Sequence, residues 1–286
     1  MKVLIYGGSG FLGRNLANYL NKKKHKVTVF DKKKIYFDKK NIKFIKGDIL
    51  NLSQVQKATK GQDIVYNLAG ISDIGDSIKN PISTTRINIL GSVFTLEAAV
   101  KYRVKRYIFA SSIYVLSRQG GFYKTSKQSV ESFIEEYNKR NNLKYTILRY
   151  GSVYGPESDR RNGIKKIISS ALKNKSILYG GTAKAERRFI HVHDAVKASE
   201  QILKKKFVNK RVLITGLKKI KIKKLVKKIK SILNIDKKVL FQRKPMLGHY
   251  DKNPFNDPPK KQITFLVKPT INLESGIKQI IDELRK

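Results

Sequence analysis

A tyrosine and a lysine four residues apart form a pair of side chains suited to acid–base chemistry. Tyr123 and Lys127 stand in the segment YKTSK, at the start of a helix predicted over 123–140. Residues four apart lie on one face of a helix. A lysine ammonium near a phenol favours the phenolate, so we expect a lowered pKa for Tyr123 and proton exchange with a substrate hydroxyl. The alternative is a surface pair without function, because a lysine-rich chain contains this spacing by chance.

Two serines lie just before this helix, where a strand is predicted to end. Ser111 closes the apolar run RYIFAS (106–111), and Ser112 follows it. Ligands of parallel α/β sheets bind at the carboxyl ends of the strands. A serine hydroxyl there can bond the substrate oxygen on which Tyr123 would act. The alternative is that both serines cap the end of the strand.

A glycine-rich turn at the start of the chain predicts a dinucleotide site. Gly7, Gly10 and Gly13 follow the apolar run KVLIY (2–6) and open a helix pattern. Glycine allows the tight turn and the close approach of a pyrophosphate, which then lies at a helix N-terminus. Asp31 ends the next apolar run, where a carboxylate can accept hydrogen bonds from both ribose hydroxyls. The carboxylate favours NAD over NADP, although the following lysines soften its repulsion of a 2′-phosphate.

The elements that must position these residues alternate between strand and helix patterns. This alternation predicts an α/β fold, a Rossmann-type doubly wound parallel sheet. We expect residues 1–150 to form the NAD-binding domain, with segments around 188–216 returning to it, and 151–286 to form mainly a smaller substrate-binding lobe. The predicted strands are 2–6, 26–30, 42–45, 63–69, 106–111, 144–150 and 211–214; the predicted helices are 11–23, 51–60, 80–102, 123–140, 163–174, 194–204 and 218–233, with a last helix from 274. We expect 245–261 to form an irregular loop.

The charge of the chain is unusual. Its 62 Lys and Arg residues against 21 Asp and Glu give a net charge of +41. Nucleic acid or an anionic membrane is one interpretation. The lysines are spread over nearly every polar face without interleaved aromatics, so we expect neither partner, and we interpret the charge as a compositional bias. A basic amphipathic segment at 218–233 could touch a membrane, but we expect its apolar stripe to pack on the protein.

The chain contains no cysteine, which excludes a thiolate nucleophile and a disulfide framework and fits a cytoplasmic location. We expect His191 and His193 to lie on one strand and to point to one face. No third ligand stands nearby, so we predict no metal site and a structural or hydrogen-bonding role for both.

Segments in a fixed order along most of the chain make it resemble the extended short-chain dehydrogenase/reductase family. The resemblance is to the nucleotide-sugar epimerase/dehydratase group, of the UDP-glucose 4-epimerase type. The matching segments include GGSGFLG, GDIL, NLAG, SSIYV, YKTSK, LRYGSVYGP, RRFIHVHDAVKA and LITG. The resemblance implies NAD as cofactor, a nucleotide-sugar substrate, a homodimer formed by the helices at 80–102 and 123–140, and a setting in polysaccharide synthesis.

The resemblance also implies a role for each matching residue. Tyr123 is the acid/base, Lys127 its partner, and Ser112, three residues before Val115, the catalytic hydroxyl. The residues implied to hold the cofactor are Gly7, Gly10, Phe11, Leu12, Gly13, Asp31, Asp48, Ile49, Leu68, Ala69, Tyr123 and Lys127. Those implied to contact substrate are Ser111, Ser152 and Arg187, with Arg187 on the diphosphate.

Several positions depart from the family pattern. The segment from Ser112 to Tyr123 is short, Ser152 replaces an asparagine, and Arg188 replaces an aspartate. Ile113 and Tyr114 stand where 4,6-dehydratases of the group carry an Asp-Glu pair, so we expect neither dehydration nor decarboxylation. The reactions left open are NAD-dependent epimerisation, with a transient 4-keto sugar, and NAD(P)H-dependent reduction of a 4-keto sugar. A non-catalytic dinucleotide sensor is a further alternative.

Overall fold

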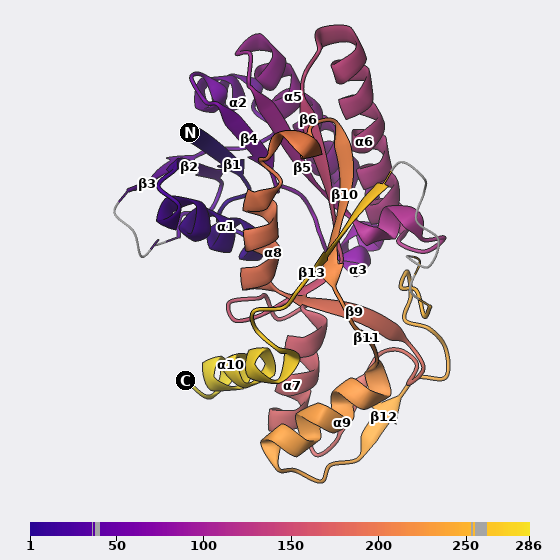
Figure 1. The fold of residues 1–286 in the computed structure, drawn as a ribbon. Coiled ribbons are helices and arrows are strands. Elements are labelled where there is room, and N and C mark those ends of the chain that lie inside the picture. Colours follow the sequence, from indigo (N-terminus) through magenta and orange to yellow (C-terminus); the bar gives the residue numbers. More distant parts are fainter. Residues whose placement is uncertain (36, 38–40, 253, 255–261) are drawn as a thin grey trace.

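An eight-stranded parallel sheet forms the centre of the molecule (Figure 1). The computed structural model describes residues 1–286 except 36, 38–40, 253 and 255–261. The strand order is β3-β2-β1-β4-β5-β6-β10-β13. Their bounds are β1 Lys2–Tyr6, β2 Lys26–Asp31, β3 Ile42–Lys46, β4 Ile64–Asn67, β5 Arg106–Ser112, β6 Tyr145–Tyr150, β10 Lys210–Gly216 and β13 Gln262–Val267. The predicted α/β, Rossmann-type fold is confirmed, and the order of the strands reverses between β1 and β4.

Alternating side chains of the strands face two helical layers. Val3 and Ile5 of β1 pack with α1 (Phe11–Lys22) and α8 (Val192–Gln201). Leu4 and Tyr6 pack on the other face, where α2 (Leu52–Thr59), α5 (Gly91–Lys101) and α6 (Gly121–Asn141) lie. Each fully buried aliphatic side chain contributes about 1.5–3 kcal/mol. Burial on both faces therefore explains why these strands read as continuous apolar runs.

A smaller lobe lies beyond the carboxyl ends of the strands (Figure 1). It holds a sheet of β11 (Lys219–Lys221), β9 (Glu186–His191) and β7 (Ser152–Tyr154), and a pair formed by β12 (Val239–Phe241) and β8 (Ile177–Tyr179). Three helices share its apolar core: α7 (Gly163–Lys173), α9 (Ile222–Leu233) and α10 (Leu273–Arg285). The apolar stripe of α9 is buried in this core, which confirms that the stripe packs on the protein.

The structure corrects the prediction for the histidine pair. Strand β9 ends at His191, and His193 lies in the first turn of α8, so the two do not share a strand face. The His191 Nδ1 accepts a hydrogen bond from the His193 N–H at 3.2 Å, which caps α8. Within the described part of the chain, no group of three or more His, Cys, Asp or Glu side chains could hold a metal ion.

Other differences concern the bounds of elements. The predicted helix over 80–102 divides into α4 (Pro81–Thr84), a π-helix (Thr85–Leu90) and α5. Helix α3 (Ile74–Lys79) and strand β13 were not predicted. The predicted loop over 245–261 lies partly outside the described residues. Among the described helices, none is long and apolar enough to cross a bilayer.

Candidate active site

A cavity of about 750 Å³ lies between the carboxyl ends of the strands and the small lobe. The strands β1, β4, β5 and β6 end at its walls, on both sides of the point where the strand order reverses. Every site residue predicted from the sequence lines it: Gly7, Gly10, Phe11, Leu12, Gly13, Asp31, Asp48, Ile49, Leu68, Ala69, Ser111, Ser112, Tyr123, Lys127, Ser152 and Arg187. The fold thus brings together residues that lie up to 180 positions apart in the sequence.

The glycine turn at one end of the cavity has the geometry of an anion cradle. Gly7 adopts φ +73°, and a Cβ there would lie 2.6 Å from the Ala69 backbone nitrogen. A Cβ on Gly13 would lie 2.3 Å from the Gly7 carbonyl oxygen. Helix α1 begins after Gly10 with no side-chain cap and no acidic residue in its first turn. Its first amide N–H groups are therefore free to bind a phosphate, and the turn fits a dinucleotide.

Asp31 closes the same end of the cavity. Its carboxylate accepts hydrogen bonds from the backbone N–H groups of Ser9 at 3.0 Å and Lys33 at 3.1 Å. These contacts fix the carboxylate beside the glycine turn. Lys32 is bound to Asp48 at 2.9 Å, so its charge is directed away from Asp31. This arrangement favours a ribose diol over a 2′-phosphate.

Tyr123 and Ser112 meet at the other end of the cavity, one from α6 and the other from the end of β5. Tyr123 is 9% exposed. Burial raises the pKa of Tyr123 above its ordinary value of 10, and a hydrogen bond with Ser112 lowers it. The expectation of a lowered pKa is therefore wrong for this structure, because burial outweighs the other effects. The phenol is held as a proton donor at neutral pH.

Lys127 lies one helical turn after Tyr123 and is buried beside it. Its Nζ donates a hydrogen bond to the Ala110 carbonyl at 2.8 Å and lies 5.9 Å from the centre of the Tyr123 ring. The Phe109 ring is closer, with its centre 4.7 Å from Nζ. Burial lowers the pKa of Lys127 from 10.5 to about 8, against the opposing effect of Glu131. The Lys127 side chain therefore carries its proton at pH 7, but its pKa lies only about one pH unit higher.

Ser111 lies in the cavity wall, but its hydroxyl is directed at a buried ion pair. The hydroxyl donates to Glu131 Oε1 at 2.6 Å. Arg149 binds the same carboxylate, with Nε at 3.0 Å from Oε1 and a terminal nitrogen at 2.5 Å from Oε2. Ser112, whose hydroxyl reaches Tyr123, is thus the better placed of the two serines for chemistry. The proton of the Ser111 hydroxyl is already committed.

Arg187 presents a guanidinium to the cavity from β9. It is 8% exposed, it donates to the Glu186 carbonyl at 2.8 Å, and its charge lies 4.1 Å from the centre of the Tyr250 ring. Tyr250 in turn bonds Ser152, a contact that partly offsets the rise in its pKa caused by burial. Arg187 and Ser152 therefore lie close together on the small-lobe side of the cavity.

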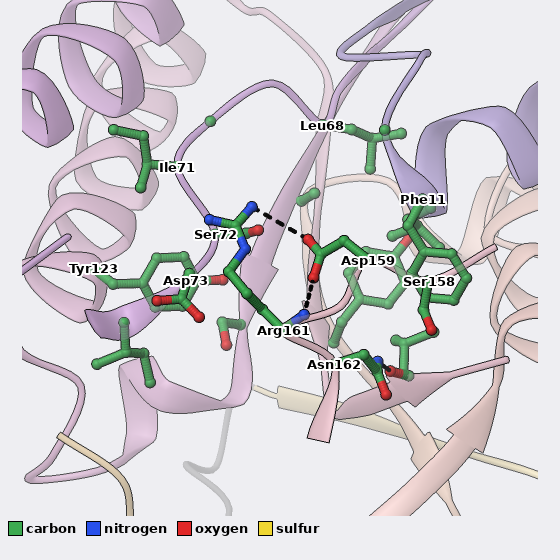
Figure 2. A pocket seen from close by; sticks show the side chains of 18 of the residues that line it. Phe11, Leu68, Ile71, Ser72, Asp73, Tyr123, Ser158, Asp159, Arg161 and Asn162 are labelled. Atoms are coloured by element: carbon green, nitrogen blue, oxygen red, sulfur yellow. Dashed lines mark hydrogen bonds and ion pairs between the residues drawn. The ribbon is translucent and has the colours of Figure 1, made fainter. Parts of the chain in front are cut away.

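The sequence did not indicate several lining residues. Asp73, Tyr114, Asp159, Arg161, Lys166 and His249 come from different loops and elements, and no short motif connects them. Figure 2 shows Arg161 bonded to the Asp159 carboxylate through its guanidinium, at 3.3 Å, and its backbone N–H, at 2.7 Å. Arg161 also pairs with Asp76 of α3, so it links the loop after β7 to the helix that follows β4.

The π-helix explains how the loop after β4 is held. Asn88 accepts a hydrogen bond from the Ile71 N–H at 2.7 Å and donates to the Ile71 carbonyl at 3.1 Å and to Ser126 at 3.0 Å. Such π segments are frequent at functional sites. Asn88 thereby ties the loop of Leu68 and Ala69 to α6, which carries Tyr123.

Known proteins resemble this chain in sequence and in fold. A putative UDP-glucose 4-epimerase of Methanocaldococcus jannaschii is 28% identical over 99% of this chain and 98% of its own length. The dTDP-D-glucose 4,6-dehydratase of Dictyostelium discoideum is 31% identical over 71% of this chain, and the match spans 56% of that protein. The structure of UDP-glucuronic acid 4-epimerase from Bacillus cereus, in complex with UDP-glucuronic acid and NAD, superposes with a TM-score of 0.86 at 23% identity. That match covers 100% of this chain and 99% of the other.

The model of one family spans most of the chain. It matches residues 3–215, which include the glycine turn, the Tyr123–Lys127 pair and Arg187. The chain belongs to the NAD dependent epimerase/dehydratase family.

Proposed function

We propose that this protein is a nucleotide-sugar 4-epimerase that uses NAD. One observation carries the proposal: Ser112, Tyr123 and Lys127 lie in one wall of a cavity whose far end holds the glycine turn and Asp31. A dinucleotide with its pyrophosphate on α1 and its ribose on Asp31 would extend toward Tyr123. The remaining space, on the side of Arg187, is left for the substrate.

In this proposal NAD, when bound, supplies the chemistry of hydride exchange at C4 of the sugar. The Tyr123 phenol first gives its proton to solvent; the phenolate then takes the proton of the 4-hydroxyl and later returns it to the keto oxygen. The Ser112 hydroxyl orients the same sugar oxygen. Lys127 stabilises the phenolate that forms and donates to the nicotinamide ribose. Asp48, Ile49, Leu68 and Ala69 line the cofactor's path.

We propose that the substrate is a nucleotide sugar whose diphosphate binds Arg187. A guanidinium offers paired donors to phosphate oxygens. Ser152 and the wall residue Ser111 are the other proposed substrate contacts. Ile113 and Tyr114 supply no carboxyl group to move protons at neighbouring carbons, which disfavours a 4,6-dehydratase. The relatives named above include both an epimerase and a dehydratase, so an experiment must distinguish the two reactions.

Two experiments separate the alternatives. First, we expect denatured protein to release NAD. Second, from a panel of UDP-, dTDP-, GDP- and CDP-hexoses, we expect the protein to interconvert one sugar with its 4-epimer without net use of cofactor. Protein that is purified without cofactor and oxidises NADPH with a 4-keto sugar nucleotide is a reductase instead. Formation of a 4-keto-6-deoxy sugar would identify a dehydratase.

A non-catalytic dinucleotide sensor is tested by Tyr123→Phe. This variant keeps the ring and removes the acidic proton, so we expect turnover to fall by a factor of about 10²–10⁴ while NAD stays bound. Tyr102→Phe, at the half-buried residue that ends α5 outside the cavity, is the control and should keep full activity. Equal activity of Tyr123→Phe and the wild-type protein would favour the sensor.

We also propose which part of the chain binds each ligand. We assign cofactor binding to residues 1–150 with the returning segments around 188–216, and substrate binding mainly to 151–286. Placement of α8 and β10 on the central sheet supports this division. We further propose a homodimer formed through the helices at 80–102, which are α4, the π-helix and α5, and through α6. We also propose a cytoplasmic location, where NAD and nucleotide sugars are available.

A further inference from the structure

Tyr114 and His249 form a hydrogen-bonded pair beside the proposed catalytic tyrosine. The Tyr114 hydroxyl lies 2.7 Å from His249 Nδ1. The Tyr114 ring meets the Tyr123 ring edge-on, with 6.4 Å between the ring centres. Both side chains line the cavity, although 135 positions separate them in the chain. They therefore border the space in which the sugar of a bound substrate would lie.

The pair presents one free donor to that space. Burial lowers the pKa of His249 to about 4, with Arg187 and Lys166 acting in the same direction, so the imidazole is neutral. Burial raises the pKa of Tyr114, so the phenol keeps its proton. Either atom of this neutral pair could be the donor; we assign the phenol as the donor, which places the imidazole proton on Nε2. That N–H has no partner among the described residues and suits a sugar hydroxyl.

Asp73 places a negative charge near the same donor. It begins α3, where its Oδ1 accepts a hydrogen bond from the Asp76 N–H at 2.8 Å. Asp73 and His249 line the same cavity, and the charge of Asp73 raises the pKa of the imidazole. Asp73 lies on the loop that borders the cavity (Figure 2). Its carboxylate can accept a hydrogen bond from a hydroxyl and repels a second carboxylate.

Two cations of the cavity, Lys32 and Arg161, pair with carboxylates of the protein. Lys32 pairs with Asp48 at the adenosine end. Arg161 pairs with Asp76 and Asp159. Arg187 and Lys166 both act on His249 as positive charges, and the two negative charges of the proposed diphosphate would offset them. With both charges offset in this way, Asp73 would be the charged group that a carboxylate at C6 of the sugar meets beside His249.

We propose that Tyr114, His249 and Asp73 are specificity-determining residues that select an uncharged hexose over a hexuronic acid. The proposal rests on the function proposed above and concerns the same cavity. The imidazole N–H and the Asp73 carboxylate bond hydroxyl groups of the sugar, while Tyr114 fixes the imidazole. A uronate carboxylate at this place meets Asp73 without a counter-charge.

The test is a titration of the NAD-loaded protein with UDP, UDP-glucose and UDP-glucuronic acid. We expect the wild-type protein to bind UDP-glucose at least tenfold more tightly than UDP-glucuronic acid. Asp73→Asn removes the charge and keeps a good helix cap. It should reduce that ratio about tenfold and leave the affinity for UDP unchanged. Asp63→Asn, just before the amino end of β4 and outside the cavity, controls for the loss of one charge.

Tyr114→Phe tests the hydrogen bond of the pair. It should weaken binding of UDP-glucose about five- to tenfold, because His249 loses its orientation, and should leave UDP binding unchanged. Binding of UDP-glucuronic acid as tight as that of UDP-glucose, or an unchanged ratio in Asp73→Asn, overturns the inference while the proposed function stands. Failure to bind any of these ligands, or the matching dTDP compounds, overturns the proposed function as well.

Discussion

At the scale of single residues, the state of Lys127 sets an upper limit to the pH range of activity. Its pKa of about 8 lies well below the ordinary value of 10.5 because the ammonium is buried. Above pH 8 the amine loses its proton and can no longer stabilise the phenolate of Tyr123. We therefore expect log kcat/KM to fall as the pH rises through about 8. A plot that stays level up to pH 10 would contradict this prediction.

The same burial makes the charge of Lys127 unfavourable for folding. The group binds its proton less tightly in the folded than in the unfolded chain, so stability increases as the pH rises from about 8 to 10.5. The change in pKa corresponds to about 3 kcal/mol. We expect Lys127→Met to be inactive yet more stable than the wild type at pH 7 in urea unfolding, by at most that amount. The advantage should disappear above pH 10.5.

Gly13 determines whether α1 can approach the turn that would hold the pyrophosphate. A Cβ at this position would lie 2.3 Å from the Gly7 carbonyl oxygen and 2.7 Å from the Gly8 Cα, and both are backbone atoms that cannot turn aside. Gly13→Ala must therefore displace the helix from the turn. We expect NAD affinity to fall at least tenfold, measured by titration. Gly163→Ala, where a Cβ meets nothing within 4 Å, should leave NAD affinity unchanged.

Residue patterns that act over short distances could be read from the sequence, and those that depend on the folded chain could not. The glycine spacing and the Tyr123–Lys127 pair are local, and both lie where they were predicted to lie. The pairing of Tyr114 with His249 requires a loop to return to the end of β5, which no local pattern records. The direction of the Tyr123 pKa was missed because spacing does not reveal burial.

At the scale of elements, a buried ion pair fixes α6 to the sheet. Glu131 lies two turns after Tyr123 and bonds Ser111 of β5 and Arg149 of β6. Its side chain is 7% exposed and that of Arg149 is 9% exposed. Removal of one partner of a buried ion pair costs about 3–5 kcal/mol. We expect Glu131→Ala to lose about that much stability in urea unfolding.

The control for this prediction lies on the same helix. Glu136 pairs with Lys139 at 2.6 Å, and its side chain is 48% exposed. Water screens such a pair, so Glu136→Ala should not change stability measurably. Equal losses in the two variants would mean that the burial of the Glu131 pair is not the cause. Ser111→Ala, which removes only the neutral donor, should fall between them.

The elements themselves were predictable to the extent that their pattern was strong. Each predicted strand of the central sheet was found within one or two residues of its bounds, because burial on both faces keeps these runs apolar. The predicted helix over 80–102 instead contains a π-helix, in which Asn88 turns to the loop at Ile71. A π-helix held by such a tertiary hydrogen bond leaves the spacing of apolar residues almost unchanged. The sequence pattern therefore did not reveal the π-helix.

At the scale of the whole molecule, apolar side chains remain exposed on the helices proposed to form the dimer. Ile82 is 76% exposed, Leu90 is 42% exposed and Phe133 is 42% exposed. They come from α4, the π-helix and α6, which contact one another in the fold. A surface of a chain with a net charge of +41 offers few places where two copies could approach without repulsion. An apolar face on these helices is such a place.

Phe133→Glu tests the proposed dimer. A carboxylate in the middle of an apolar interface must be buried without a partner, which disfavours association strongly. We expect the wild-type protein to have the mass of two chains in light scattering after gel filtration, and Phe133→Glu to have the mass of one. Leu178→Glu, on β8 of the small lobe and 54% exposed, introduces the same charge away from this face and should stay dimeric. Because the cavity is formed within one chain, the monomeric variant should still bind NAD. A wild-type monomer, or a Phe133→Glu dimer, would show that the helices at 80–102 and α6 do not form the interface.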